Sequence, residues 1–147
     1  LYNSYLPGLV CGLIYVFITF MNTHNKKKFI LLVFLISMIG YSFDSILVFS
    51  KVYSFETSLY FGLLPIWMLV LWPSFAVLFD EVFKYLSKYK LIAVFFSGIL
   101  GPLTYYSGRP LGLINIYQLS LFIVFMVIFW LLLMLFYLNY IVKIKFN

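Results

Sequence analysis

The sequence predicts an all-α fold, a polytopic bundle of about five transmembrane helices, on three observations. The first is composition: of 147 residues, 65% are hydrophobic and 10% are charged, whereas a soluble domain is about 45–50% apolar and about 25% charged. The second is that the apolar residues form five runs, each near the ~20 residues that a ~30 Å hydrocarbon core requires. The third is that the charged residues lie mainly at the ends of these runs.

The five runs set the expected helices of one domain covering residues 1–147. They place helices at 7–21, 29–50, 58–79, 91–107 and 117–142. Segment 111–118 is left open, either as part of the fifth helix or as a bent or interfacial approach to it. The runs are too long, and alternate too little, for strands of a membrane barrel. The first run lacks the flanks of a signal peptide, so we expect it to be retained, and whether residues precede Leu1 is left open.

Prolines and small residues inside the runs are expected to shape the helices. Pro65 and Pro73 both fall in the third expected helix and should kink it, because each lacks a backbone donor. The fourth run is short and is interrupted at Gly101-Pro102. Gly8 and Gly12 have the four-residue spacing that lets two membrane helices approach closely.

Lysine and arginine are divided unequally between the two sides of the expected bundle. Eight of these basic residues lie in the connections after the first and third helices and in the segment after the fifth. The other two connections carry only Lys51 and Arg109. Because positive residues concentrate on the cytoplasmic side, we expect the N-terminus outside and the C-terminus in the cytoplasm, in a bacterial inner (plasma) membrane. The net charge of +6 then follows from topology, and no nucleic-acid partner is expected.

Asp44 is the candidate for chemistry. It lies in the second run, six residues before Ser50, or about 9 Å at 1.5 Å per residue. A charge near mid-membrane costs about 2.5–3.5 kcal/mol on insertion scales and normally meets a partner or a cavity. We expect its carboxylate to point into the bundle toward Arg109, Lys51 or a tyrosine hydroxyl from another helix. Two roles stay equally open: a structural ion pair or cap, and a proton-transfer or ligand-anchoring group.

Arg109 is the expected partner of Asp44. It precedes Pro110, which disfavours helical geometry, so the fourth helix should end near Gly108 on the outer side, within reach of a long arginine. Four aromatic residues complete the expected ligand-binding set: Tyr41, Trp67, Tyr105 and Tyr106. The alternative is that each aromatic belongs to the ordinary interfacial belt of a membrane protein.

The other polar residues are interpreted structurally. Asp80 and Glu81 precede Lys84 at helical spacing, which is typical of surface ion pairs. Cys11 and His24 each stand alone, which excludes a cysteine-based metal site. The sequence has no zinc-protease, nucleotide-binding or serine-hydrolase motif. We therefore expect no metal and no cofactor, and whether the protein is an enzyme is left open.

Three segments resemble a known family. Residues 40–48 read G-Y-S-F-D-S-I-L-V, residues 65–76 read P-I-W-M-L-V-L-W-P-S-F-A, and residues 101–112 read G-P-L-T-Y-Y-S-G-R-P-L-G. Their order and spacing are similar to those of small bacterial inner-membrane proteins, the domain-of-unknown-function family 2878. The chain departs from that pattern at residues 80–82 and at Leu100. The resemblance implies a membrane protein but no activity, and it implies importance for six residues: Asp44, Trp67, Trp72, Pro102, Tyr105 and Gly108.

Three classes of function stay open. The first is a lipid- or isoprenoid-handling protein, enzyme or accessory, with a polar site in the outer half of the bilayer. The second is a structural or assembly subunit of a larger membrane complex. The third is a small transporter that works as an oligomer. The expected partners are membrane lipids and further membrane subunits, either copies of this chain or others.

Overall fold

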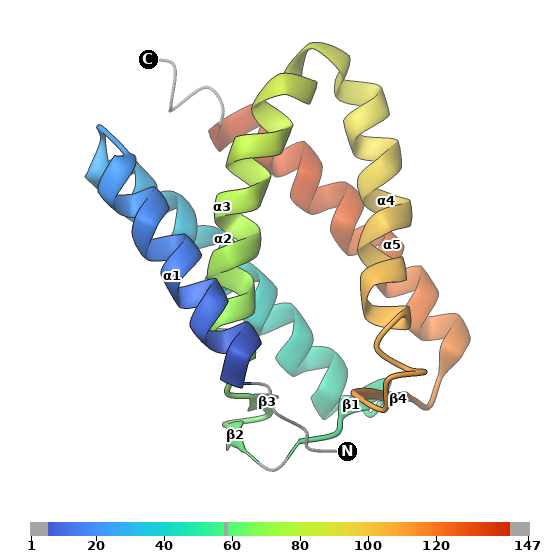
Figure 1. Ribbon diagram of the computed structural model, residues 1–147. Helices are drawn as coiled ribbons and strands as arrows, with labels where there is room; N and C mark the ends of the chain where they lie inside the picture. Colours follow the sequence, from blue (N-terminus) through green and yellow to red (C-terminus); the bar gives the residue numbers. More distant parts are fainter. Residues whose placement is uncertain (1–5, 58, 142–147) are drawn as a thin grey trace.

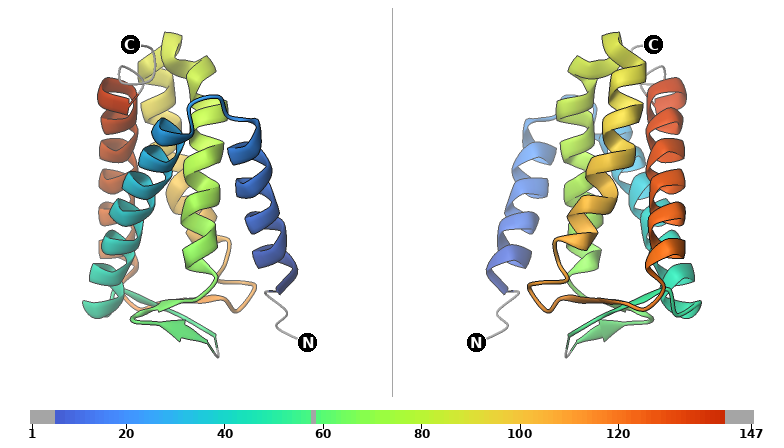
Figure 2. Two further views of the ribbon diagram at one scale, coloured as in Figure 1. Left: turned by 90° about the vertical axis from the view of Figure 1, so that its left-hand side faces the viewer. Right: turned by 90° about the vertical axis from the view of Figure 1, so that its right-hand side faces the viewer.

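Five helices lie side by side along one axis, and four short strands close one end of them (Figures 1 and 2). The computed structural model describes residues 6–57 and 59–141. The helices are α1 (Leu6–Asn22), α2 (Lys26–Phe49), α3 (Met68–Leu86), α4 (Lys90–Tyr106) and α5 (Leu119–Phe136). The 3-10 turn η1 (Ser87–Tyr89) joins α3 to α4, and the π-helical turn η2 (Tyr137–Ile141) follows α5. The strands are β1 (Tyr53–Phe55), β2 (Tyr60–Phe61), β3 (Leu64–Pro65) and β4 (Ile114–Ile116).

Two of these helices are long and apolar enough, by length and composition, to cross a membrane. They span Lys26–Phe49 and Leu119–Asn139, and the apolar parts of the other three helices are shorter. Large apolar side chains point outward from every helix, as Phe17, Phe34, Leu78, Phe95 and Phe125 do. Soluble monomers rarely expose apolar patches beyond a few hundred Å². The helical fold is confirmed, while the five crossings and their orientation stay predictions.

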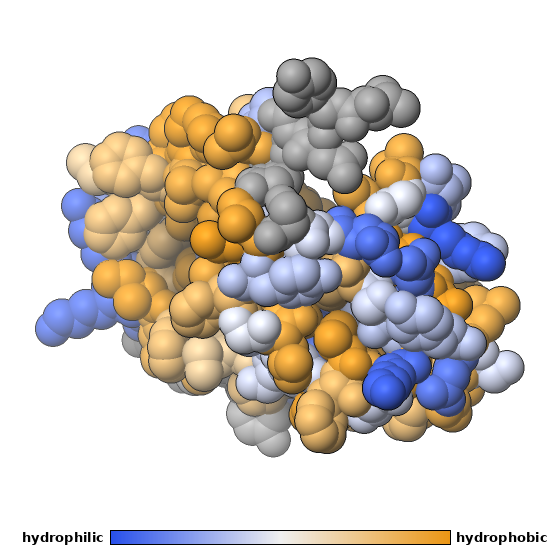
Figure 3. Space-filling model, turned by 90° about the horizontal axis from the view of Figure 1, so that it is seen from below, coloured by the Kyte–Doolittle hydropathy of each residue, from blue (hydrophilic) through white to orange (hydrophobic). Residues whose placement is uncertain are grey.

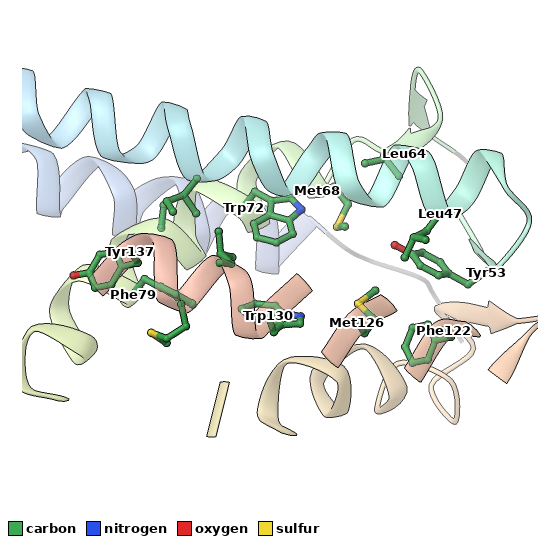
Figure 4. Packing of buried hydrophobic residues seen from close by; sticks show 14 of the residues in the cluster. Leu47, Tyr53, Leu64, Met68, Trp72, Phe79, Phe122, Met126, Trp130 and Tyr137 are labelled. Atoms are coloured by element: carbon green, nitrogen blue, oxygen red, sulfur yellow. The ribbon is translucent and has the colours of Figure 1, made fainter. Parts of the chain in front are cut away.

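The helices pack as two groups. Helices α1 and α2 both pack on α3, and α4 packs along α5. Figure 1 shows α3 and α4 converging at η1 and diverging toward the strand end. Large aromatic side chains fill the layer between the groups (Figure 4). The indoles of Trp72 and Trp130 stack there with centroids 6.0 Å apart, and Phe43 stacks on Phe129 at 3.8 Å.

Glycines seat both stacked indoles against helix backbones. A Cβ added at Gly40 would lie 2.2 Å from Cδ2 of Trp72, and one at Gly101 would lie 2.2 Å from Cδ2 of Trp130. Gly8 and Gly12, which were predicted from their spacing to allow close helix packing, differ in the structure. A Cβ at Gly12 would lie 2.7 Å from a methyl group of Val70 on α3, whereas one at Gly8 would meet nothing within 4 Å. Of these two glycines, Gly12 is therefore the one that serves close helix packing in the described part of the chain.

The second helix begins and ends with defined caps. The Asn25 side chain accepts a hydrogen bond from the Lys28 backbone N–H at 3.1 Å, so α2 starts at Lys26, three residues before the predicted start. At the other end, Lys51 adopts a left-handed φ of 54°. Its N–H donates to Val48 O, and the Val52 N–H donates to Leu47 O, each at 3.0 Å. This paired arrangement satisfies the last carbonyls of the helix and directs the chain into β1.

The region predicted as the start of the third helix is instead a hairpin. Strands β2 and β3 pair antiparallel with Tyr60 opposite Pro65, and Gly62 between them has a φ of +63°. Helix α3 consequently starts ten residues later than predicted and continues beyond Phe79 to Leu86. Pro65 lies in β3, so the predicted kink at that residue is wrong, while Pro73 does lie inside α3.

Two further expectations are corrected near the fourth helix. The Gly101-Pro102 pair does not interrupt α4, which runs unbroken to Tyr106 with Pro102 inside it. The open segment 111–118 is neither helix nor bent helix start. Its residues Ile114–Ile116 form β4, which pairs antiparallel with β1, and α5 begins after Gln118.

Candidate functional site

Asp44 is the centre of a buried hydrogen-bonded cluster near the strand end. Its side chain is 0% exposed. Oδ1 accepts from the Tyr53 hydroxyl at 2.6 Å, and Oδ2 accepts from Trp72 Nε1 at 2.8 Å. The Tyr105 hydroxyl lies 3.0 Å from Oδ1 and 2.8 Å from Oδ2. The cluster joins α2, β1, α3 and α4, and the expected contact with a tyrosine from another helix is confirmed by Tyr105.

Each donor of the cluster is placed by its own local structure. Gly40 lies one helical turn before Asp44, and its missing side chain leaves the space that the Trp72 ring occupies. The left-handed turn at Lys51 returns the chain so that Tyr53 lies beneath the end of α2. Tyr105 belongs to the last turn of α4, which packs along α5.

The three donors are electrically neutral. An indole N–H can only donate, and a hydroxyl can do both. Burial, together with the nearby Asp44 carboxylate, raises the pKa of the Tyr53 hydroxyl well above its ordinary value, so Tyr53 stays protonated and donates at neutral pH. The Tyr53 ring is held edge-on by Phe55 at 5.3 Å and by Phe122 at 5.8 Å. The cluster therefore offers a carboxylate with fixed donors inside an aromatic surround.

Arg109 is not a partner of Asp44, and the predicted ion pair is wrong. Within the described part of the chain, the three donors above account for the polar contacts of Asp44. Arg109 is exposed in a turn in which its N–H donates to Tyr106 O and its carbonyl accepts from Gly112 N–H. Those two bonds keep the residue on the outside of the loop that follows α4.

The other predicted aromatics lie in the strand end. The Tyr41 hydroxyl donates to Phe61 O, and Trp67 packs edge-on against Phe55 at 5.4 Å. Tyr106 is exposed. Four further polar residues at this end make hydrogen bonds in or beside the strands: Tyr60 to Phe55 O, Asn115 to Glu56, Tyr117 to Ser54 and Gln118 to Lys51 O. Seen from this end, the surface carries both polar and apolar residues, with many of the hydrophilic ones gathered on the right of the view (Figure 3).

Two members of the cluster were missed as site residues, Tyr53 and Trp72. Trp72 carried a usable signal, because a tryptophan inside an apolar run needs an acceptor for its N–H, and Asp44 is the acid inside a neighbouring run. Tyr53 carried no such signal in the sequence, because its position near Asp44 depends on the turn at Lys51. The side chains of Asp80, Glu81 and Lys84 lie outside the described residues, so their predicted ion pairs stay predictions.

Two buried polar side-chain atoms have no hydrogen-bond partner among the described residues. They are Trp130 Nε1 and Ser37 Oγ. Trp130 is 3% exposed and its indole stacks on that of Trp72. In the described part of the chain, no three His, Cys, Asp or Glu side chains gather in a way that could hold a metal ion.

Together, the apolar helices and the buried acid define a helical bundle with membrane-capable helices and a polar cluster at its strand end. Residues 2–136 match the family model described as "Protein of unknown function (DUF2878)". The chain belongs to this family, as the three sequence segments predicted. Comparison with curated proteins and with solved structures gave no match.

Proposed function

We propose that the chain is a bacterial inner-membrane protein that crosses the bilayer five times, with its N-terminus outside. Helices α2 and α5 have the length and hydropathy of spans, and the other three lie alongside them (Figure 2). The α1–α2 and α3–α4 connections share the end opposite the strands, and their lysines 26, 27, 28, 88 and 90 gather there. Positive residues favour the cytoplasmic side. A reporter that works only in the cytoplasm should be active when it is fused after Asn147. Activity of a reporter that works only in the periplasm would contradict this orientation.

Within this topology, the proposed function is to bind the polar end of a lipid-like molecule at the Asp44 cluster, in the outer half of the bilayer. The observation that carries it is the unequal burial of the three donors. Tyr53 and Trp72 are fully buried and hold one carboxylate oxygen each, whereas Tyr105 is half-buried and shares both oxygens. Tyr105 is thus the member of the cluster whose side chain is not fully buried.

The roles of the residues follow from their contacts. Asp44 accepts a hydrogen bond from the ligand. Tyr53 and Trp72 orient the carboxylate, and Tyr105 covers it from the side of α4. Buried acids in membrane proteins are costly and commonly functional, and ligand sites are mostly apolar with a few convergent polar groups. Arg109 and Tyr106 lie outside this cluster, on the exposed surface at the same end.

A second candidate function is a structural or assembly subunit of a larger membrane complex. The observation that favours it is the complete burial of Asp44 with both oxygens satisfied, which is how a carboxylate that only joins helices would be arranged. In that case the cluster would hold α2, β1, α3 and α4 together, and the exposed apolar helix faces would carry the function.

Lipids that co-purify with the protein separate the two candidates. We would extract them from wild type and from Asp44→Asn, which keeps the size of the side chain and removes its charge, and compare them by mass spectrometry. Tyr106→Phe, an exposed neighbour of Tyr105, is the matched control. The lipid-binding proposal expects one lipid class to be lost in folded Asp44→Asn alone. Unchanged lipids in folded Asp44→Asn would overturn it in favour of the structural role.

A further inference from the structure

We infer that the end of the bundle opposite the strands binds the anionic headgroups of phospholipids, through lysines of the α1–α2 and α3–α4 connections. This inference goes beyond the proposed function, because it concerns a different surface from the Asp44 cluster. Both connections lie at that end (Figure 1). Four described lysines there are exposed: Lys26, Lys27, Lys88 and Lys90. We call these four residues the basic end.

The two connections have a surplus of positive charge. Residues 23–28 and residues 82–92 each contain three lysines and no acid. Asp80 and Glu81 precede the second of these segments, and two carboxylates can neutralise only two of the lysines. The surplus that remains favours an anionic partner at this end of the molecule.

The position of these lysines in their helices makes the positive charge unfavourable in the chain alone. Lys26 and Lys27 begin α2, and Lys90 is the first residue of α4. The helix dipole places partial positive charge at the N-terminus of a helix, where a lysine is repelled. Neither first turn contains an acidic residue. Anionic headgroups beside both turns would offset this repulsion.

Exposed aromatic and apolar side chains accompany the lysines of the α3–α4 connection. Tyr85 and Tyr89 are exposed, and the side chain of Leu91, which follows Lys90 directly, is 87% exposed. Tyrosines collect at the boundary between lipid headgroups and acyl chains. Lysine stems lie along apolar surface while their amino groups stay at the level of the phosphates. The α3–α4 connection therefore has the composition of a segment that lies in this boundary.

The positive charges are spread over the end of the bundle and do not converge on one point. Figure 1 shows the two connections apart from each other. Lys26 lies on the α1 side, with its Nζ 5.1 Å from the centroid of the Phe20 ring, whereas Lys88 and Lys90 belong to η1 and α4. A small soluble anion needs several donors around one point, but a layer of headgroups can meet lysines that are spread out. Anionic lipids give the cytoplasmic leaflet a negative surface potential, and the proposed topology directs this end toward that leaflet.

Two lipids with identical acyl chains test the inference on the detergent-purified protein: phosphatidylglycerol, which is anionic, and phosphatidylcholine, which is zwitterionic. We would measure a binding constant for each in mixed micelles, at low and at high salt. Each lysine near an anionic lipid surface contributes roughly a factor of five, so phosphatidylglycerol is expected to bind at least about tenfold more tightly at low salt. The difference should shrink at high salt, which screens exposed charges.

Two results of this measurement would overturn the inference. The first is equal binding of the two lipids by the wild type at low salt. The second is full competition by glycerophosphoglycerol, the same anionic headgroup without acyl chains, at concentrations that match those of the lipid. That result would mean that the lysines bind a soluble anion and not a lipid surface.

Removal of charge from each end of the bundle gives a matched comparison. Lys88→Gln combined with Lys90→Gln should reduce the preference for phosphatidylglycerol at least about fivefold. Lys51→Gln combined with Arg109→Gln removes the same charge from the strand end and should leave the preference unchanged. An equal loss in both double variants would mean that total charge alone attracts the lipid, and would overturn the inference. The comparison of the two lipids uses wild type alone, so it decides the question even if a variant does not fold.

Discussion

The indole of Trp72 lies directly on the backbone of Gly40, and this contact sets the distance from Trp72 to Asp44. Gly40 and Asp44 are four residues apart and share one face of α2. With the ring against Gly40, Trp72 Nε1 reaches Asp44 Oδ2 at 2.8 Å. Any side chain at residue 40 would occupy the space of the ring, since even a Cβ would lie 2.2 Å from it. The absence of one side chain therefore permits the hydrogen bond one turn away.

Gly40→Ala should displace Trp72 and break its bond to Asp44. Overpacking costs about 1–3 kcal/mol and a hydrogen bond to a charged group about 1.5–3 kcal/mol, against at most about 1 kcal/mol gained in helix propensity. We expect a net loss of about 2–4 kcal/mol, measured by thermal unfolding in one detergent. Ser42→Ala, on the exposed face of α2, should change little. A Gly40→Ala variant as stable as wild type would contradict the packing described here.

The two stacked tryptophans allow a matched comparison of the Asp44 hydrogen bond. Trp72→Phe and Trp130→Phe remove the same atoms from buried rings, but only the Trp72 N–H has a partner among the described residues. Without ligand, Trp72→Phe should cost about 1.5–3 kcal/mol more than Trp130→Phe, the worth of a hydrogen bond to a charged acceptor. Chemical unfolding of both variants measures the difference. Equal losses would mean that Trp72 contributes packing alone.

The left-handed turn after α2 predicts a stabilising substitution. Lys51 has a φ of 54°, a conformation that costs a non-glycine residue about 1–2 kcal/mol. Lys51→Gly keeps the backbone hydrogen bonds of the turn, and we expect it to raise the stability by about 1 kcal/mol. Gly112→Ala makes the reverse change at a φ of +68° in open space and should lower the stability by a similar amount. Melting temperatures that move in the opposite directions would contradict the left-handed backbone conformation at these two residues.

Docking of the first helix depends on one of its two spaced glycines. Gly12→Ala would place a methyl group 2.7 Å from a methyl of Val70 and 3.0 Å from Ser74 Oγ, so α1 must shift away from α3 at a cost of about 1–3 kcal/mol. Gly8→Ala meets nothing within 4 Å and is the control. Limited proteolysis of the α1–α2 connection should be faster in Gly12→Ala only. Equal rates in both variants would indicate that α1 does not pack through Gly12.

Much of the bundle could be predicted from the sequence, because each helix corresponds to a long run of apolar residues that can be recognised without knowing its tertiary contacts. The strand end could not. Residues 53–55 and 114–116 each alternate apolar, polar, apolar, but three residues are too few to establish a period of two, and their pairing joins segments that are about sixty residues apart. The hairpin at 60–65 depends on the positive φ of Gly62, which composition does not reveal inside an apolar run.

The candidate site was predicted only in part. An acid in an apolar run needs hydrogen-bond partners, so Asp44 and Tyr105 could be named in advance. The choice of Arg109 as a partner followed opposite charge and side-chain reach, and it was wrong because backbone hydrogen bonds to Tyr106 O and from Gly112 N–H fix the loop with the arginine outside. Trp72 was named only through the family resemblance and not as a site residue. Tyr53 was not found because its position depends on the turn at Lys51.

The central claim is that the Asp44 cluster binds the polar end of a lipid-like molecule, and photolabelling tests it most directly. Membranes containing wild type or Asp44→Asn would be irradiated with a membrane lipid that carries a photoreactive group in an acyl chain, and the labelled residues would be mapped by mass spectrometry. We predict labelling of α4 and α5 near the strand end, reduced by an excess of the same lipid without the photoreactive group and absent from Asp44→Asn that melts cooperatively. Labelling of the same residues to the same extent in folded Asp44→Asn would contradict the claim.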